Sequence, residues 1–187
     1  KTDPSETLLR LQTFNSSGFR VAYDFAAIGE VEQMDYSQYT PKGMTPLLDA
    51  VARTIRETEK YIETFSGDNE QVIVTVMTDG LENCSQEYSY STVREMIDSK
   101  KKLGWTFTYL GANHDVWSVA SRMGINREDT RKYDPQNPKG AFAHSAIRTM
   151  NIKERWRFIR NSKLNVAPCP VCRVGEISRN KDRLFEC

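Results

Sequence analysis

Two residues of this 187-residue chain, Thr45 and Asp79, combine a side chain and a position that suit metal binding. Thr45 stands directly before PLLDAV, whose apolar spacing indicates the start of a helix. Asp79 directly follows the stretch 71–78, QVIVTVMT, which is typical of a strand buried on both faces of a parallel sheet. Because ligands of open α/β sheets bind beyond the carboxyl ends of the strands, we expect both side chains at that edge. Hydroxyl and carboxylate oxygens suit Mg²⁺, Mn²⁺ or Ca²⁺.

Each of these residues also has a purely structural interpretation. Thr45 could serve only as the N-cap of the helix, with Pro46 as its first residue. The Asp79-Gly pair could be an ordinary turn after a strand. Glu82 and Asn83 follow closely, and they could either orient water at a bound metal or stabilise the turn itself.

A second metal-binding pattern lies near the C-terminus, where Cys169 and Cys172 form a Cys-x2-Cys knuckle and Cys187 follows. Structural zinc takes four ligands in a tetrahedron, so these three thiolates leave the fourth ligand missing. Cys84 stands alone in the chain and is the less favoured fourth ligand. The segment 168–187 resembles part of a zinc ribbon with a structural or recruiting role. Cysteine spacing of this kind favours metal over disulfides, and with it a reducing, cytoplasmic location.

The elements that must position these residues alternate between strands and helices. We predict a hairpin around a four-residue turn, two further strands and four helices, with Trp105 and Trp117 in the core. The strands are expected at 6–14, 19–28, 71–78 and 105–112, and the helices at 46–66, 89–103, 115–124 and 139–150. This order predicts an α/β fold with a doubly wound, mostly parallel, Rossmann-like sheet, to which the hairpin adds one antiparallel edge.

Length and composition bound the organisation and the functional class. We predict one α/β domain at 1–150, a basic linker at 151–167 and the partial zinc ribbon at 168–187. A balance of 26 Lys+Arg against 25 Asp+Glu gives no global attraction to nucleic acid or anionic membrane. No apolar run approaches the roughly 20 residues that span a bilayer. His114 follows a predicted strand, but no nucleophile–base pair or phosphate-binding glycine loop accompanies it, so we predict no catalytic residue.

The region 6–150 resembles a von Willebrand factor A-type domain of the bacterial and phage cytoplasmic kind. The matching stretches are KGMTPLLDAV (42–51), VIVTVMTDGLEN (72–83), YSYSTVREMI (88–97) and GWTFTYLGANHDVWSVASRMGI (104–125). The resemblance implies a metal-ion-dependent adhesion site, in which Thr45 and Asp79 join an Asp-x-Ser-x-Ser loop. In such a site the ion keeps one open coordination position, which an acidic side chain of a protein partner fills. The resemblance therefore implies metal-dependent protein binding without catalysis.

The chain departs from the family in one respect, because it contains no Asp-x-Ser-x-Ser motif. In the family this loop follows a first strand at the centre of the sheet, between the strands expected here at 6–14 and 71–78. That strand and the first helix are expected to precede Lys1. We therefore expect these 187 residues alone to bind Mg²⁺ weakly or not at all, and to be poorly stable.

Two other functions stay open at this stage. In one, Asp79 and a bound Mg²⁺ serve a phosphohydrolase-like α/β enzyme, which an upstream Asp-x-Asp motif would favour over binding. In the other, the basic stretch 153–163, with Trp156 among its cations, and the zinc ribbon associate with nucleic acid.

Overall fold

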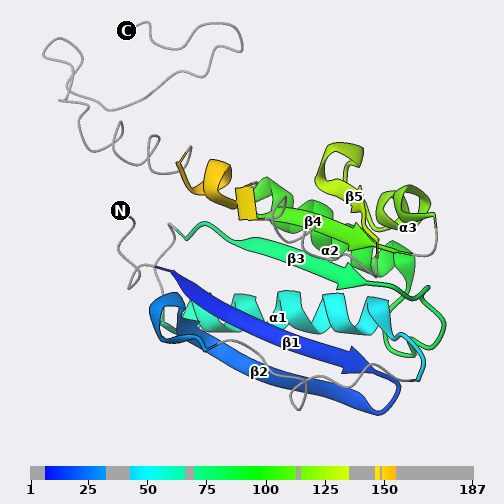
Figure 1. Cartoon of the computed structure of the whole chain (residues 1–187), viewed down its shortest axis with the longest axis horizontal. Coiled ribbons are helices and arrows are strands. Elements are labelled where there is room, and N and C mark those ends of the chain that lie inside the picture. The colour runs from blue at the N-terminus through cyan, green and yellow to red at the C-terminus, as the bar shows by residue number, and fades with distance from the viewer. Residues whose placement is uncertain are drawn as a thin grey trace, which may run out of the picture. The chain divides into compact units, whose positions relative to one another are not determined.

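The computed structural model describes residues 7–32, 43–65, 70–112, 115–134, 146–147 and 149–154 (Figure 1). The chain divides into two compact units, Lys1–Ile147 and Arg148–Cys187. Of the second unit only 149–154 is described, and it is helical. Most of the predicted basic linker and all three zinc-ribbon cysteines, Cys169, Cys172 and Cys187, therefore lie outside the described residues.

Five strands of the first unit form two separate sheets (Figure 1). An antiparallel hairpin comprises β1 (Leu8–Asn15) and β2 (Gly18–Ala27). A parallel sheet has the order β3-β4-β5, with β3 (Ile73–Thr78), β4 (Thr106–Gly111) and β5 (Thr130–Lys132). The prediction of an α/β fold with parallel and antiparallel strands is confirmed. Among the described strands the hairpin forms a sheet of its own, because β1 and β3 do not pair.

The hairpin turn is tighter than the sequence predicted. Only Ser16 and Ser17 connect the strands, and the Ser17 N–H donates to the Asn15 side-chain oxygen at 2.8 Å. Gly18 adopts a φ of 132°, a conformation that favours glycine. Asn15 and Gly18 therefore belong to the strands rather than to a four-residue loop.

Three helices pack on the sheets: α1 (Leu47–Phe65), α2 (Tyr90–Lys102) and α3 (Val116–Arg122). The Ser89 and Asp115 side chains cap α2 and α3. Gly104 and Gly124 follow the helix ends with φ values of 90° and 82°, which confirms them as stop signals. Two 3-10 turns, Ile28–Glu30 and Arg127–Asp129, complete the described elements.

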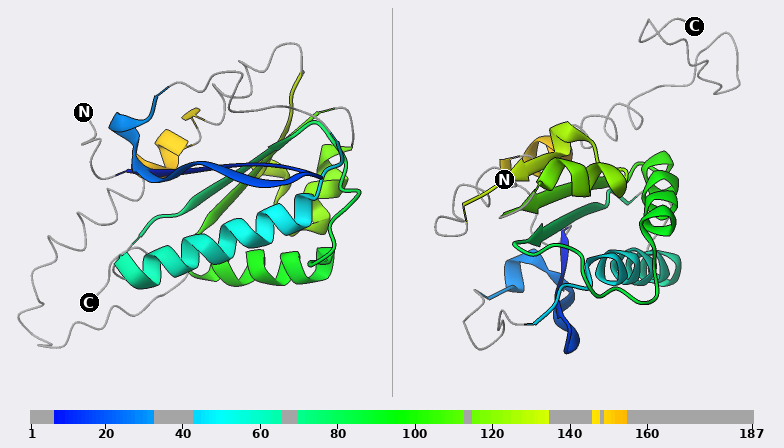
Figure 2. Two further views of the ribbon diagram at one scale, coloured as in Figure 1. Left: turned by 90° about the horizontal axis from the view of Figure 1, so that it is seen from below. Right: turned by 90° about the vertical axis from the view of Figure 1, so that its right-hand side faces the viewer.

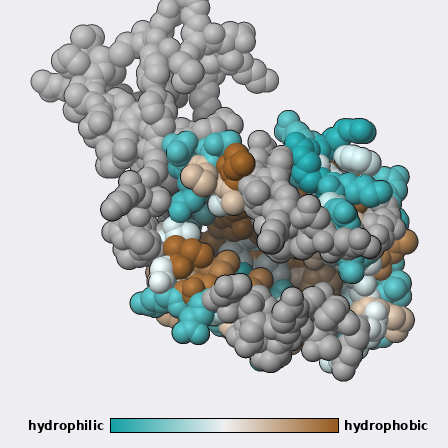
Figure 3. Space-filling model, viewed as in Figure 1, coloured by the Kyte–Doolittle hydropathy of each residue, from teal (hydrophilic) through white to brown (hydrophobic). Residues whose placement is uncertain are grey.

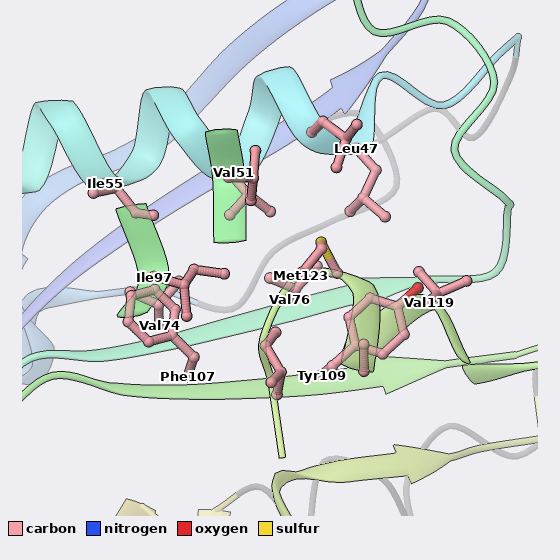
Figure 4. Close-up of a cluster of buried hydrophobic side chains, with 14 of the residues drawn as sticks. Leu47, Val51, Ile55, Val74, Val76, Ile97, Phe107, Tyr109, Val119 and Met123 are labelled. Carbon is pink, nitrogen blue, oxygen red and sulfur yellow. The ribbon is translucent and has the colours of Figure 1, made fainter. Parts of the chain in front are cut away.

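All three helices bury side chains in a single core on one face of the β3-β4-β5 sheet (Figures 2 and 4). Figure 4 shows α1 residues directed at β3, β4 and α3, and the labelled set is Leu47, Val51, Ile55, Val74, Val76, Ile97, Phe107, Tyr109, Val119 and Met123. α1, α2 and α3 form one helical layer on that face. The described part of the chain therefore shows an α/β fold with one parallel and one antiparallel sheet.

Several burial predictions fail where an element lies at the edge of the packed layers. In β3, Val74, Val76 and Thr78 are buried but Thr75 is exposed, so the strand is not buried on both faces. Trp117 is 39% exposed, with the Arg127 guanidinium over its ring, whereas Trp105 is in the core as predicted.

Two differences concern the end of the chain's α/β region. The short strand β5 has the polar sequence TRK, which carries no apolar signal and was not predicted. Residues 146–147 and 149–154 are helical, so helix extends beyond the predicted end at Met150, and the predicted start at 139 lies outside the described residues. No described helix is long and apolar enough to cross a membrane.

Candidate divalent-cation site

The structure brings Thr45 and Asp79 to the same edge of the parallel sheet. Asp79 and Gly80 form the turn directly after β3, and Thr45 lies two residues before α1. The Thr45 hydroxyl oxygen lies so close to Gly80 that a Cβ added to this glycine would overlap it. The close approach requires glycine at this position, and it places the hydroxyl one residue from Asp79.

A reciprocal pair of hydrogen bonds holds Thr45 in place. Its N–H donates to the Asn83 side-chain oxygen at 2.7 Å, and its carbonyl accepts from the Asn83 N–H at 3.3 Å. Both bonds use the Thr45 backbone, so its hydroxyl is not consumed by them. Of the two roles considered for Asn83, these contacts support stabilisation of the turn.

Thr45 does not cap α1, which corrects its structural interpretation as an N-cap. The first helical hydrogen bond runs from the Ala50 N–H to the Pro46 carbonyl at 3.1 Å, and the helix begins at Leu47. The unpaired amides of its first turn are instead satisfied by the loop after β3. The Leu48 N–H donates to the Glu82 carboxylate at 2.9 Å and to the Ser85 hydroxyl at 3.1 Å, and the Asp49 N–H donates to Ser85 at 3.2 Å.

Glu82 is fully engaged in this loop. Besides Leu48, its carboxylate accepts from the Cys84 N–H at 3.0 Å, the Ser85 N–H at 2.8 Å and the Ser85 hydroxyl at 2.7 Å. A negative charge at the amino end of a helix is also favoured by the helix dipole. The contacts therefore assign Glu82 to stabilising the turn and the start of α1.

Asp49 holds the next part of the same loop, a role that the sequence analysis missed. The residue is 5% exposed, and its carboxylate accepts from the N–H groups of Gln86, Glu87 and Tyr88 at 2.9, 3.1 and 3.0 Å. The three donors lie 37 to 39 residues away along the chain. No local pattern could reveal such a contact, although a charged residue next to the apolar stripe of a helix was an available signal.

Asp79 differs from both of these acids. It is exposed, and no hydrogen bond or ion pair to its carboxylate is found within the described part of the chain. The Thr45 hydroxyl likewise has no hydrogen-bond partner among the described residues. The turn between the two is fixed by the Gly80 N–H, which donates to the Thr78 hydroxyl at 3.2 Å. The Asp79 carboxylate, in the turn after β3, and the Thr45 hydroxyl, which lies against Gly80, are thus two hard oxygens without hydrogen-bond partners among the described residues.

These two oxygens fit a divalent cation in part. Mg²⁺ takes about six oxygen ligands and commonly keeps several waters while binding one or two protein carboxylates. A hydroxyl and a single carboxylate are suitable donors in type, but they leave most positions to water or to other groups. Within the described ranges, no group of three or more His, Cys, Asp and Glu side chains is arranged to hold a metal.

The other residues considered in the sequence have simpler roles or cannot be placed. Partial burial raises the pKa of the Cys84 thiol, and the nearby carboxylates of Glu82 and Asp49 raise it further. A thiol with a raised pKa is a poor nucleophile and a poor metal ligand at neutral pH. Asp115 accepts from the Ser118 N–H at 3.2 Å as a helix cap, and His114 lies outside the described residues.

No protein-family model, curated protein or solved structure was found to match this chain.

Proposed function

We propose that this chain is a divalent-cation-dependent protein-binding module of the von Willebrand factor A type, without catalytic activity. Thr45 and Asp79 would contribute to the site for Mg²⁺, Mn²⁺ or Ca²⁺, and an acidic side chain of a protein partner would complete it. The observation that supports this most is the pairing of an unengaged hydroxyl with an unengaged carboxylate, beside acids whose hydrogen-bonding capacity is used.

The charge at this site favours an acidic partner. Among the described carboxylates near the site, Asp79 makes no hydrogen bond, whereas Glu82 and Asp49 are engaged by backbone amides. A bound divalent cation would keep a net positive charge, which attracts a further carboxylate. Because Asp79 is exposed at the sheet edge, a ligand from another protein can approach without rearrangement of the described residues.

Paramagnetic broadening by Mn²⁺ tests the site at low affinity. We expect millimolar Mn²⁺ to broaden the backbone amide signals of Gly80 and Leu81 in the NMR spectrum of the full chain, and excess Mg²⁺ to reverse the effect. Asp79→Asn should abolish the broadening, because it removes the charge and leaves the shape of the side chain. Asp115→Asn is the matched control, since an asparagine still caps α3.

Two results would contradict the proposal. One is broadening that is equal in the Asp79→Asn variant and the unaltered chain. The other is broadening centred on exposed acids elsewhere, with Gly80 unaffected at saturating Mn²⁺.

We also propose that Cys169, Cys172 and Cys187 bind structural Zn²⁺, on the basis of their spacing alone. Zinc analysis of the purified full chain should show a loss of bound metal in a Cys169→Ser variant. Cys84→Ser is the control and should retain it. Equal zinc content in all three proteins, or none in any, would contradict this assignment.

A further inference from the structure

A surface pocket of about 410 Å³ lies between α2, α3 and the segment 124–127, which leads into the second 3-10 turn. Pockets of this size commonly hold small molecules. The lining comprises Arg94 of α2, Trp117 and Ser121 of α3, and residues 124–127. Figure 3, in the orientation of Figure 1, shows hydrophilic residues gathered around β5 and its neighbours. No lining residue belongs to the candidate cation site.

Contacts between α2 and the segment after α3 hold the walls of the pocket together. The Arg94 guanidinium donates to the Ser121 carbonyl at 3.3 Å, and the Lys101 ammonium donates to the Gly124 carbonyl at 2.7 Å. Gly124 adopts a φ of 82°, and a Cβ added to it would lie only 3.2 Å from the Arg94 side chain. Ile125 lines the pocket and is also part of the hydrophobic core. These contacts fix the shape of the pocket from both sides.

The polar side chains that line the pocket offer hydrogen-bond donors and few acceptors. Arg94 and Arg127 carry donors only. The Asn126 side-chain oxygen accepts from the Lys101 ammonium at 3.5 Å, which leaves the amide nitrogen of Asn126 as a donor. The Ser121 hydroxyl has no hydrogen-bond partner among the described residues. A ligand that satisfies this lining must therefore supply acceptor oxygens and negative charge.

Both guanidinium groups remain available to such a ligand. The Arg94 Nε lies 3.7 Å from the Asp98 carboxylate in an exposed i,i+4 pair with the base first, which is a weak arrangement. Arg127 forms no ion pair within the described part of the chain, and the acids at 128–129 do not line the pocket. Its guanidinium carbon lies 5.1 Å from the centre of the Trp117 ring. A guanidinium stacked on an aromatic face keeps its edge N–H groups free, so Trp117 orients Arg127 without using its donors.

We propose that this pocket binds the phosphate group of a small phosphate ester, with Arg94 and Arg127 donating to the phosphate oxygens. Planar guanidinium groups match phosphate oxygens two at a time. A phosphate monoester offers three terminal acceptor oxygens, whereas a carboxylate offers two, and two guanidinium groups with Asn126 and Ser121 present more donors than a carboxylate can satisfy. The volume of the pocket suits a molecule of about the size of a mononucleotide.

NMR titration of the full chain with AMP, at low ionic strength and with EDTA present, tests the pocket without reference to the cation site. We expect saturable shifts of the backbone amides of Asn126 and Arg127 and of the Nε–Hε signals of Arg94 and Arg127. Ribose 5-phosphate and inorganic phosphate should shift the same signals, and adenosine should bind about tenfold or more weakly than AMP. Tighter binding of AMP than of ribose 5-phosphate would add a contact with the base, and equal binding would show that the phosphate alone is recognised.

Matched substitutions separate a specific site from a general attraction to positive charge. Arg127→Gln should weaken AMP binding about tenfold, and Arg127→Lys should restore only part of it, because lysine keeps the charge but lacks the planar fork. Arg56→Gln is the control and should bind AMP normally. Arg56 is likewise exposed, with its guanidinium carbon 5.2 Å from the centre of the Tyr88 ring, but it does not line the pocket. Asp79→Asn should also leave AMP binding nearly unchanged, which separates this pocket from the candidate cation site.

Three outcomes would overturn the proposal. Adenosine that binds as tightly as AMP would show that the phosphate group is not what the pocket recognises. Equal weakening by Arg56→Gln and Arg127→Gln would assign the binding to diffuse surface charge. Unchanged AMP affinity in both Arg94→Gln and Arg127→Gln, or no shift at Asn126 and Arg127 in millimolar AMP, would show that the pocket does not hold the phosphate.

Discussion

Two aspartates near the start of α1, Asp49 and Asp79, have the same chemistry and opposite environments. Asp49 is 5% exposed and accepts hydrogen bonds from three backbone amides of the loop 86–88. Asp79 is exposed at the end of β3, and no described residue donates to it. A carboxylate that accepts hydrogen bonds from backbone amides stabilises the fold. An exposed carboxylate without such donors remains available to a ligand.

Hydrogen bonds to α1 hold the loop after β3 in place beside the candidate binding site. Glu82 and Ser85 satisfy the first amides of α1, and Asp49 satisfies amides further along the same loop. These contacts attach the loop to α1 at both of its ends. The Asp79-Gly80 turn is thereby positioned by its neighbours rather than by its own side chain.

The largest expected effect is that of Asp49→Ala on stability. It leaves three part-buried amides without their acceptor, so we expect a loss of about 3 kcal/mol in the free energy of unfolding, measured by urea denaturation. Asp49→Asn retains the oxygen position that serves Glu87 and Tyr88, and it should lose about half as much. An Asp49→Ala variant within about 0.5 kcal/mol of the unaltered chain would show that these hydrogen bonds contribute little to stability.

A smaller loss is expected from Gly80→Ala. The new Cβ would overlap the Thr45 hydroxyl oxygen, so we expect a loss of about 1 to 2 kcal/mol in urea denaturation. The Thr45 Cβ, in contrast, is 3.5 Å from the added Cβ position, an ordinary contact. Adding Thr45→Ala should therefore recover most of the stability, and a double variant as unstable as Gly80→Ala would show that the clash lies elsewhere.

Asp79→Ala should leave the fold nearly unchanged. The side chain is exposed and makes no hydrogen bond with the described residues, so its removal should alter the free energy of unfolding by less than about 0.5 kcal/mol. The same urea titration measures it beside Asp49→Ala. A loss comparable to that of Asp49→Ala would assign Asp79 a structural role and remove the contrast between the two residues.

The smallest effect concerns the reactivity of Cys84. Because burial and the charges of Glu82 and Asp49 raise its pKa, the thiolate forms only at higher pH than for an ordinary cysteine. Alkylation of Cys84 by iodoacetamide should therefore be slow near pH 8, and Glu82→Gln should lower the pKa and speed it a few-fold. Peptide mapping by mass spectrometry separates Cys84 from the other three cysteines. An unchanged rate in Glu82→Gln would indicate that burial alone sets the reactivity.

The sequence predicted the elements whose signals are local. The apolar stripe from Leu47 to Ile55 identified α1, and the helix stops at Gly104 and Gly124 depend on the conformational freedom of glycine. β5 escaped prediction because its burial depends on pairing with β4, and TRK alone has no apolar pattern. The exposure of Trp117 was missed for a similar reason, since helical periodicity does not show where a packed layer ends.

For the candidate site, the sequence by itself determined the two residues and the edge on which they lie. Strand ends and helix starts follow from local patterns, and parallel strands carry their carboxyl ends to one edge. Only the tertiary structure decided which carboxylates are engaged, because the donors to Asp49 and Glu82 include amides more than 30 residues away. It also decided that, among the described strands, β1 and β3 do not pair with each other, since strand pairing depends on tertiary arrangement and not on either strand alone.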